Sequence, residues 1–213
     1  MKIAKEKIIY VYDALCGWCF GFSPVMADFV KEYGSRVDVE VISGGLIMGE
    51  RVGPIGEVAP YIKTAYKDVE RATGVKFGDA FVNGTLEEGT MVSNSLPPAI
   101  ALAVVKQHKP EKALEYAGLL HKMVYVDGEK PEDIEAYGLY AARIGFNAKE
   151  FSATMKKPEY LTLAHEDFQY ARSLGANGFP SVYHDAGEKP TLLFSGYLPL
   201  ERMKQMVESE IFN

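Results

Sequence analysis

Residues 8–19, Ile-Ile-Tyr-Val-Tyr-Asp-Ala-Leu-Cys-Gly-Trp-Cys, place two cysteines directly after a short run of β-branched and aromatic residues. A run of this kind is typical of a strand that is buried on both faces of a sheet. Beyond the cysteines, apolar residues recur at helical spacing up to Tyr33, and Val37, Val39 and Val41 then alternate with acidic residues. The order strand, helix, strand predicts a right-handed βαβ unit with the cysteines at its first strand-to-helix junction.

The middle of the chain has a different pattern. Helical spacing dominates from about residue 60 to residue 172, with expected helices at 61–73, 97–108, 111–126, 131–145, 148–155 and 158–174. Residues 74–95 are rich in Gly, Asn, Ser and Thr, and we expect an irregular connection there. After Gly178, residues 181–184 and 191–195 predict an antiparallel hairpin, and Pro199 opens a last amphipathic helix. The predicted fold class is α/β, with a sheet domain formed by residues 1–59 and 173–213 and an all-helical insertion at 60–172.

The Cys16-Gly17-Trp18-Cys19 motif carries the chemistry. Backbone amides without intrahelical partners and the helix dipole both stabilise a thiolate at the start of a helix. Cys16 is therefore the expected nucleophile. Cys19 lies one helical turn further on, where it can attack a mixed disulfide and release the product. A dithiol of this kind needs no cofactor, although glutathione is a candidate co-substrate.

Two other interpretations of the cysteines are weaker. A zinc site needs two more ligands, yet there is no second cysteine pair, and the four histidines show no paired ligand spacing. We therefore expect no metal. Two inert buried cysteines would also fit the motif alone, but a CxxC at the strand-to-helix junction of a βαβ unit favours redox chemistry.

A second motif lies far away in the sequence, at Gly178-Phe179-Pro180-Ser181. Together with the CxxC that opens the first helix and the helical insertion, it resembles the DsbA-like branch of the thioredoxin superfamily. The stretch Asp13 to Cys19 is most similar to FrnE-like members of this branch. The resemblance implies a thioredoxin-like fold, a redox-active disulfide and a cis peptide bond before Pro180. It also implies that the substrate chain binds at Phe179 and Pro180 beside the CxxC.

The chain departs from the superfamily pattern at one informative position. Many members carry a buried acid six residues before the nucleophile, where this chain has Tyr10. Asp13 is the nearest acid by sequence and is a candidate modulator of the thiols, although it would equally serve to end the strand. Trp18 is the expected exposed aromatic residue for binding substrate, whereas Phe20 and Phe22 are expected to pack in the interior.

Composition excludes other classes of protein. The chain has 213 residues, 47% of them hydrophobic, and a formal net charge of −6 without blocks of like charge. These values are typical of a folded globular protein and speak against a nucleic-acid or polybasic membrane surface. The apolar run 8–12 is too short for a secretory or membrane-spanning segment, so we expect a cytoplasmic protein.

The predicted function is a dithiol–disulfide oxidoreductase that reduces, isomerises or oxidises protein or peptide disulfides. One alternative is a glutathione-dependent isomerase or transferase of the same architecture, in which a serine commonly replaces the nucleophile. Another is a peptide-binding chaperone without enzymatic activity. The redox partner that recycles the dithiol and the oligomeric state are not contained in the sequence.

Overall fold

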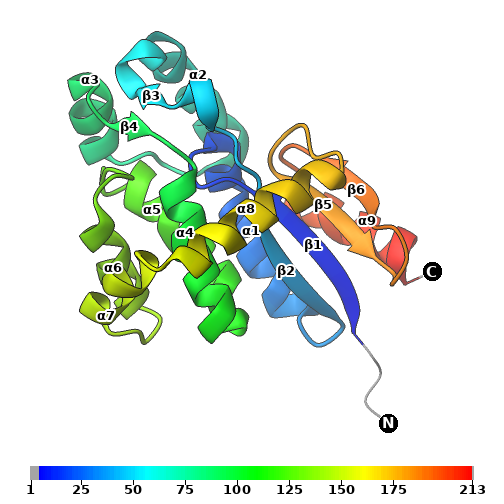
Figure 1. Ribbon diagram of the computed structural model, residues 1–213. Coiled ribbons are helices and arrows are strands. Elements are labelled where there is room, and N and C mark those ends of the chain that lie inside the picture. Colours follow the sequence, from blue (N-terminus) through cyan, green and yellow to red (C-terminus); the bar gives the residue numbers. More distant parts are fainter. Residues whose placement is uncertain (1–4, 213) are drawn as a thin grey trace.

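The computed structural model describes residues 5–212, so the ends of the predicted sheet domain, residues 1–4 and 213, lie outside the described part. The fold is built on a mixed four-stranded sheet with the order β2-β1-β5-β6 (Figure 1). Strand β1 is parallel to β2 and antiparallel to β5, which in turn pairs antiparallel with β6. The four strands are β1 (Glu6–Tyr12), β2 (Val37–Ser43), β5 (Ser181–Asp185) and β6 (Thr191–Ser195).

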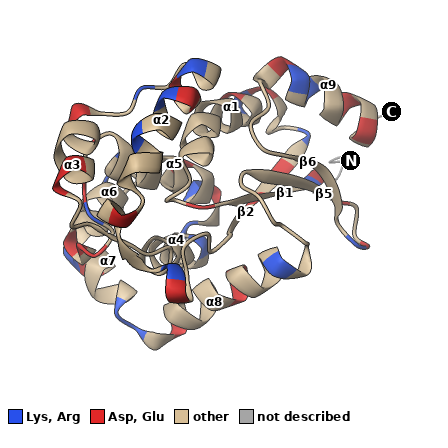
Figure 2. Cartoon of the chain, turned by 90° about the horizontal axis from the view of Figure 1, so that it is seen from above, with Lys and Arg blue, Asp and Glu red and all other residues tan. Residues whose placement is uncertain are grey.

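Strand β1 is buried on both faces, as its sequence predicts. Ile8, Tyr10 and Tyr12 alternate onto one face and join the main core beneath α1 (Gly17–Tyr33) and α9 (Leu200–Ile211). Ile9 and Val11 point to the other face, where they pack against the C-terminal half of α8 (Pro158–Ser173). The sheet is thus a middle layer between helices (Figure 2). The βαβ unit β1-α1-β2 consequently holds the start of α1 at the end of the central strand.

The region between β2 and β5 is mainly helical (Figure 1). Its longer helices agree with the predicted ones to within a few residues. They are α2 (Ala59–Thr73), α4 (Leu96–His108), α5 (Ala113–Tyr125), α6 (Ile134–Ala142), α7 (Ala148–Met155) and α8. Short 3₁₀ turns cover Gly49–Arg51, Ile55–Glu57 and Pro110–Lys112.

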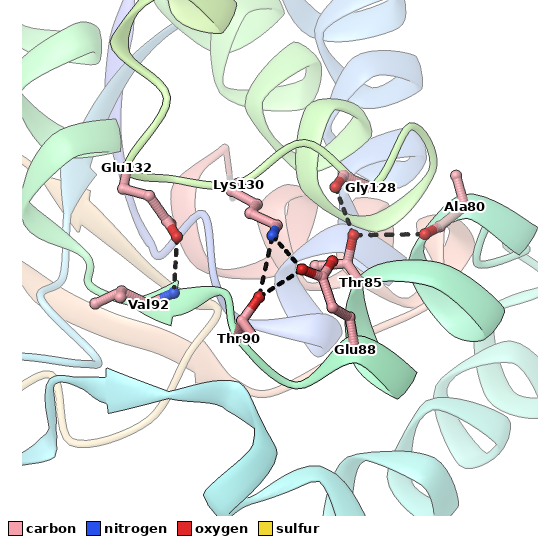
Figure 3. Close-up of polar contacts among 8 residues, drawn as sticks. All are labelled: Ala80, Thr85, Glu88, Thr90, Val92, Gly128, Lys130 and Glu132. Carbon is pink, nitrogen blue, oxygen red and sulfur yellow. Dashed lines mark hydrogen bonds and ion pairs between the residues drawn. The ribbon is translucent and has the colours of Figure 1, made fainter.

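The prediction of an irregular connection at 74–95 was wrong in part. This segment contains a π-helical turn (Ala80–Thr85), the one-turn helix α3 (Leu86–Glu88) and strand β4 (Val92–Ser93), which pairs with β3 (Gly53–Pro54). Side-chain contacts fasten the segment to the loop at 128–132 (Figure 3). The Thr85 hydroxyl donates to the Gly128 carbonyl at 2.6 Å, and Lys130 Nζ binds Glu88 at 2.8 Å and Thr90 at 3.1 Å. Tertiary contacts rather than local sequence therefore order this segment.

Acidic and basic residues are interspersed along the helices (Figure 2). Within the described range 5–212, the helices lack the combination of length and apolarity that is needed to span a bilayer.

Candidate active site

The two cysteines lie at the N-terminus of α1. Cys16 is the N-cap residue, in an extended conformation with φ −99° and ψ 112°, and its carbonyl accepts the first helical hydrogen bond from Phe20. This position puts Cys16 at the end of the helix where the first-turn amides have no partner inside the helix, although its side chain makes no capping hydrogen bond with them. Both cysteines are free thiols in this structure.

The two thiols differ in access to solvent. Cys16 is 7% exposed and lines a pocket, whereas Cys19 is 0% exposed. Burial raises the pKa of the Cys19 thiol well above its usual range, and the adjacent Cys16 adds to this effect. Cys19 is therefore a protonated thiol behind Cys16 at neutral pH. The pair is therefore asymmetric, because a substrate in the pocket meets Cys16 and not Cys19.

The loop at Phe179 and Pro180 lies next to Cys16, although 163 residues separate Phe179 from it in the sequence. The Cys16 thiol donates to the Phe179 carbonyl at 3.5 Å. The peptide bond between Phe179 and Pro180 is cis, the isomer that the resemblance implies. The Pro180 carbonyl accepts a 2.7 Å hydrogen bond from the Gly196 amide, which ties the loop to the hairpin β5-β6.

The Phe179 ring packs directly over the backbone of Gly44, at the end of β2. A Cβ at Gly44 would lie 2.2 Å from Cε1 of that ring, which no side chain tolerates. Glycine at this position therefore allows the ring to approach the sheet closely enough to hold the loop beside Cys16.

A pocket of about 370 Å³ opens in front of Cys16. Its walls come from the start of α1, the loop after β2, helix α2, the segment 77–93, the end of α5 and the loop before Pro180. Of the described residues that line it, none is acidic, basic or a histidine. They are Leu15, Cys16, Gly17, Trp18, Leu46, Ile47, Ile55, Val58, Tyr61, Ile62, Ala65, Tyr66, Val69, Phe77, Phe81, Met91, Ser93, Val124, Tyr125, Asn177, Gly178 and Phe179. The pocket therefore suits apolar groups next to a reacting sulfur.

Trp18 lies at the rim of this pocket. Its side chain is 37% exposed, with its ring 6.5 Å from that of Tyr197. Phe20 and Phe22 are buried instead, and the Phe20 ring packs 5.0 Å from that of Phe77. The structure thus brings Cys16, Trp18 and Phe179 together around one pocket and leaves Phe20 and Phe22 in the interior.

Asp13 is buried behind the cysteines, and its carboxylate organises three loops. Its oxygens accept hydrogen bonds from the Leu15 amide at 2.9 Å, the Leu46 amide at 2.8 Å and the Ser95 hydroxyl at 3.0 Å. Burial raises the pKa of Asp13, while these donors act in the opposite direction. Because Leu46 lines the pocket, this carboxylate holds one of its walls in place.

His121 also belongs to this region, although no sequence motif indicates it. Its Nε2 lies 3.0 Å from the Asp13 carbonyl oxygen, and its Nδ1 lies 2.7 Å from the Ser23 hydroxyl. Burial lowers the pKa of His121 to about 4, so the ring is neutral at neutral pH. A lone histidine in an apolar helix carries no local signal for these contacts, because its partners come from the loop after β1 and from α1.

Across residues 5–212, no cluster of three or more Cys, His, Asp or Glu side chains is arranged to hold a metal ion.

Comparison with known protein families gives one match that covers most of the chain. The sequence profile of a family described as "DSBA-like thioredoxin domain" matches residues 7–208. No curated protein sequence is significantly similar to the chain.

Several solved structures share the fold. A protein from Nitrosomonas europaea, described as a candidate protein disulfide isomerase, has a TM-score of 0.81 at 23% identity, over 97% of each chain. The cytosolic disulfide reductase DsbM from Pseudomonas aeruginosa has a TM-score of 0.75 at 25% identity, over 88% of this chain and 89% of that chain. A 2-hydroxychromene-2-carboxylate isomerase has a TM-score of 0.65 at 13% identity, over 95% of this chain and 93% of that chain.

Proposed function

The chain belongs to the family of proteins with a DSBA-like thioredoxin domain, and from this premise we propose that it exchanges dithiols for disulfides through Cys16 and Cys19. Its fold is the α/β thioredoxin-like fold with a helical region inserted between strands, as the sequence predicts. The observation that carries the proposal is the asymmetry of the two thiols. Cys16 faces a pocket and the Phe179 carbonyl, whereas Cys19 is sealed behind it.

The proposed reaction runs in two displacements. The Cys16 thiolate attacks one sulfur of a substrate disulfide, and the other substrate sulfur leaves as a thiolate that takes a proton. Cys19 then attacks Cys16, which breaks the mixed disulfide and releases the second substrate thiol. The substrate is reduced by two electrons, and the Cys16–Cys19 pair becomes a disulfide. The reverse sequence oxidises a dithiol.

The pocket supports peptide disulfides as the substrate class. Apolar and aromatic side chains next to the substrate cysteines fit walls that carry no charge. Trp18 at the rim and the Phe179–Pro180 loop are the proposed substrate contacts. Asp13 acts in this proposal as a modulator that holds the wall at Leu46 rather than as a group that touches substrate.

The direction of disulfide exchange and the cellular compartment are also part of this proposal. DsbM, 25% identical to this chain, is a cytosolic disulfide reductase, and a structure of it contains glutathione. This similarity supports reduction or isomerisation in the cytoplasm, with glutathione as co-substrate. Membership of the FrnE-like branch stays a prediction from the stretch Asp13 to Cys19.

An isomerase function is less well supported. The 2-hydroxychromene-2-carboxylate isomerase is similar to this chain in fold alone, at 13% identity. A complete and asymmetric pair of thiols has a direct use in disulfide exchange and none in simple glutathione binding.

Trapping experiments test the proposal. Cys19→Ser should accumulate a mixed disulfide with an apolar peptide that contains one disulfide, because the resolving thiol is missing. Cys16→Ser should accumulate none and should lose essentially all disulfide turnover, because buried Cys19 cannot reach the peptide. Intact-protein mass spectrometry of both variants measures the adducts. Equal trapping by the two variants would contradict the assigned roles.

A further inference from the structure

A second hollow adjoins the pocket in front of Cys16. It has a volume of about 280 Å³ and lies between the loop after β2 and the C-terminal end of α8. Leu46, Asn177 and Phe179 line both hollows, so the two are direct neighbours. The Phe179 carbonyl is 3.5 Å from the Cys16 thiol, and its ring packs over Gly44, which lines only the second hollow. A single residue thus extends from the reacting sulfur to the second hollow.

The two hollows differ in charge. The described residues that line the pocket in front of Cys16 carry no charge, whereas the second hollow is lined by Arg51 and Arg172 and by no acidic residue. Arg51 ends the 3₁₀ turn that follows β2, and Arg172 lies in the last turn of α8. Two positive groups at one small hollow create a positive potential there, although the formal net charge of the chain is −6. The second hollow therefore attracts an anion.

Both guanidinium groups can receive a ligand. Arg51 and Arg172 are exposed, and neither forms a salt bridge within the part of the chain that the structure describes. Arg172 donates only from Nε, to the Phe168 carbonyl at 3.2 Å, and its two terminal nitrogens stay free for other partners. Arg36 and Arg71, by contrast, each bind a carboxylate of the protein itself. A planar guanidinium with free N–H groups matches the two oxygens of a carboxylate.

We propose that Arg51 and Arg172 bind a carboxylate of the substrate peptide, carried by an aspartate or glutamate close in sequence to the reacting cysteine. The inference rests on the proposed function, since it names the class of peptide disulfide that is exchanged. An extended chain advances about 3.3–3.6 Å per residue, so an acidic side chain within about three residues of the cysteine can reach past Phe179 while the substrate sulfur stays at Cys16. The preferred substrate has an apolar residue on one side of its cysteine and an acidic residue on the other.

The uncharged pocket favours a peptide over glutathione as the source of this carboxylate. Glutathione carries two carboxylates and an ammonium group but no apolar side chain, so it would leave the apolar walls of the 370 Å³ pocket uncovered. A peptide with both kinds of side chain occupies both hollows at once. Because the arginines hold the substrate and do not touch the sulfurs, they should change the concentration of peptide that is needed rather than the maximal rate.

Matched peptides test the proposal. Each peptide has a single cysteine, held in a disulfide with a neutral thiol that absorbs light once it is released. A phenylalanine stands directly beside the cysteine on one side, and a glutamate or a glutamine stands at the next position but one on the other side. A second pair has the reverse order. Reduced protein is mixed with excess peptide, and the release of the thiol is followed by stopped flow at several peptide concentrations.

The wild type should reach its half-maximal rate at a lower concentration of the glutamate peptide than of the glutamine peptide, by roughly three- to tenfold, in one of the two orders. The preference should shrink at high salt, because the arginines are exposed. Arg51→Gln and Arg172→Gln should each lose part of the preference, and the double variant should lose all of it. The maximal rate and the values for the glutamine peptide should not change.

Arg202→Gln is the matched control. It removes one positive charge from an exposed arginine on α9 that lines neither hollow, and it should keep the preference for glutamate. An equal loss in this variant would show an effect of net charge alone and would overturn the inference. So would a double variant that keeps the preference, or a wild type that does not distinguish the two peptides in either order.

Two further outcomes separate this inference from its neighbours. A wild type that exchanges none of the peptide disulfides would refute the proposed function itself. Glutathione disulfide is measured beside the peptides with the same proteins. If the double variant weakens only the reaction with glutathione disulfide, then the arginines bind the carboxylate of glutathione, and the assignment to an acidic peptide is wrong.

Discussion

Three buried titratable groups at the site, Asp13, His121 and Cys19, show how burial and hydrogen bonding compete at the residue scale. Asp13 keeps its carboxylate inside the protein because two amides and a hydroxyl satisfy it. His121 has a pKa of about 4 because the ring is desolvated and its contact with the Asp13 carbonyl offsets only part of that loss. Cys19 has no access to solvent, and its contact with the Asp13 backbone offsets only part of the desolvation, so its pKa stays well above its usual range.

The lowered pKa of His121 predicts a loss of stability in mild acid. The unfolded chain takes up the proton near pH 6.5 and the folded chain only near pH 4, so this contribution is complete above about pH 6.5 and is lost as pH falls toward 4. Between about pH 7 and pH 5 the wild type loses roughly 2 kcal/mol of unfolding free energy through this histidine. His121→Gln should be less stable than the wild type at pH 7, but its unfolding free energy should fall by about 2 kcal/mol less between pH 7 and pH 5.

Urea unfolding of both proteins at the two pH values measures this difference. The raised pKa values of the Asp13 and Asp167 carboxyls have the opposite sign, since the folded state binds their protons more readily. They are present in both proteins and cancel in the comparison. Equal losses in wild type and His121→Gln would show that the folded protein accommodates a charged ring.

At the scale of elements, sequence predicts those structures whose signals are local. Helices α6 and α7 begin after Asp133 and Asn147, whose side chains accept hydrogen bonds from the first-turn amides. The ribbon of β3 and β4 has two residues in each strand, too few to show a period, and pairs Gly53 with Ser93. Its existence depends on contacts between distant segments, which explains why 74–95 was predicted to be irregular.

The Thr85 side chain anchors that segment and provides a test. Thr85→Val leaves the half-buried Gly128 carbonyl without its 2.6 Å donor, so the free energy of unfolding should fall by about 1–2 kcal/mol. Thr90→Val is the matched control, because its hydroxyl binds Glu88 and Lys130 at an exposed site, and should change stability by less than about 0.5 kcal/mol (Figure 3). Urea titrations give both values, and equal losses would refute the anchor.

At the scale of the whole molecule, the site joins parts that sequence analysis could place and parts that it could not. The CxxC and the Phe179–Pro180 loop carry local motifs, so their meeting was foreseeable from the resemblance. The pocket walls from α2 and the segment 77–93 carry no motif, because ordinary apolar residues become a wall only through packing. The predicted division of the chain into a sheet domain (residues 1–59 and 173–213) and a helical insertion (residues 60–172) stays a prediction from the sequence.

The hydrophobic core crosses this division, which predicts cooperative unfolding. The Phe20 ring on α1 lies 5.0 Å from that of Phe77 and 5.5 Å from that of Tyr125, and one cluster of buried residues includes the sheet, α1 and α5. Separating the two parts would expose these rings, so neither part gains by unfolding alone. Trp18 is the single tryptophan and reports on the start of α1, whereas far-UV ellipticity reports mainly on the helices. Both signals should show the same urea midpoint.

A substitution at the shared core sharpens this test. Phe77→Ala should lower the free energy of unfolding by about 3–5 kcal/mol and move both signals together, because the ring is buried between the two parts. Tyr61→Ala, at a side chain that is 73% exposed, should leave both midpoints nearly unchanged. If Phe77→Ala shifts the ellipticity while the Trp18 fluorescence keeps its midpoint, then the two parts unfold independently, and the core that they share does not couple them.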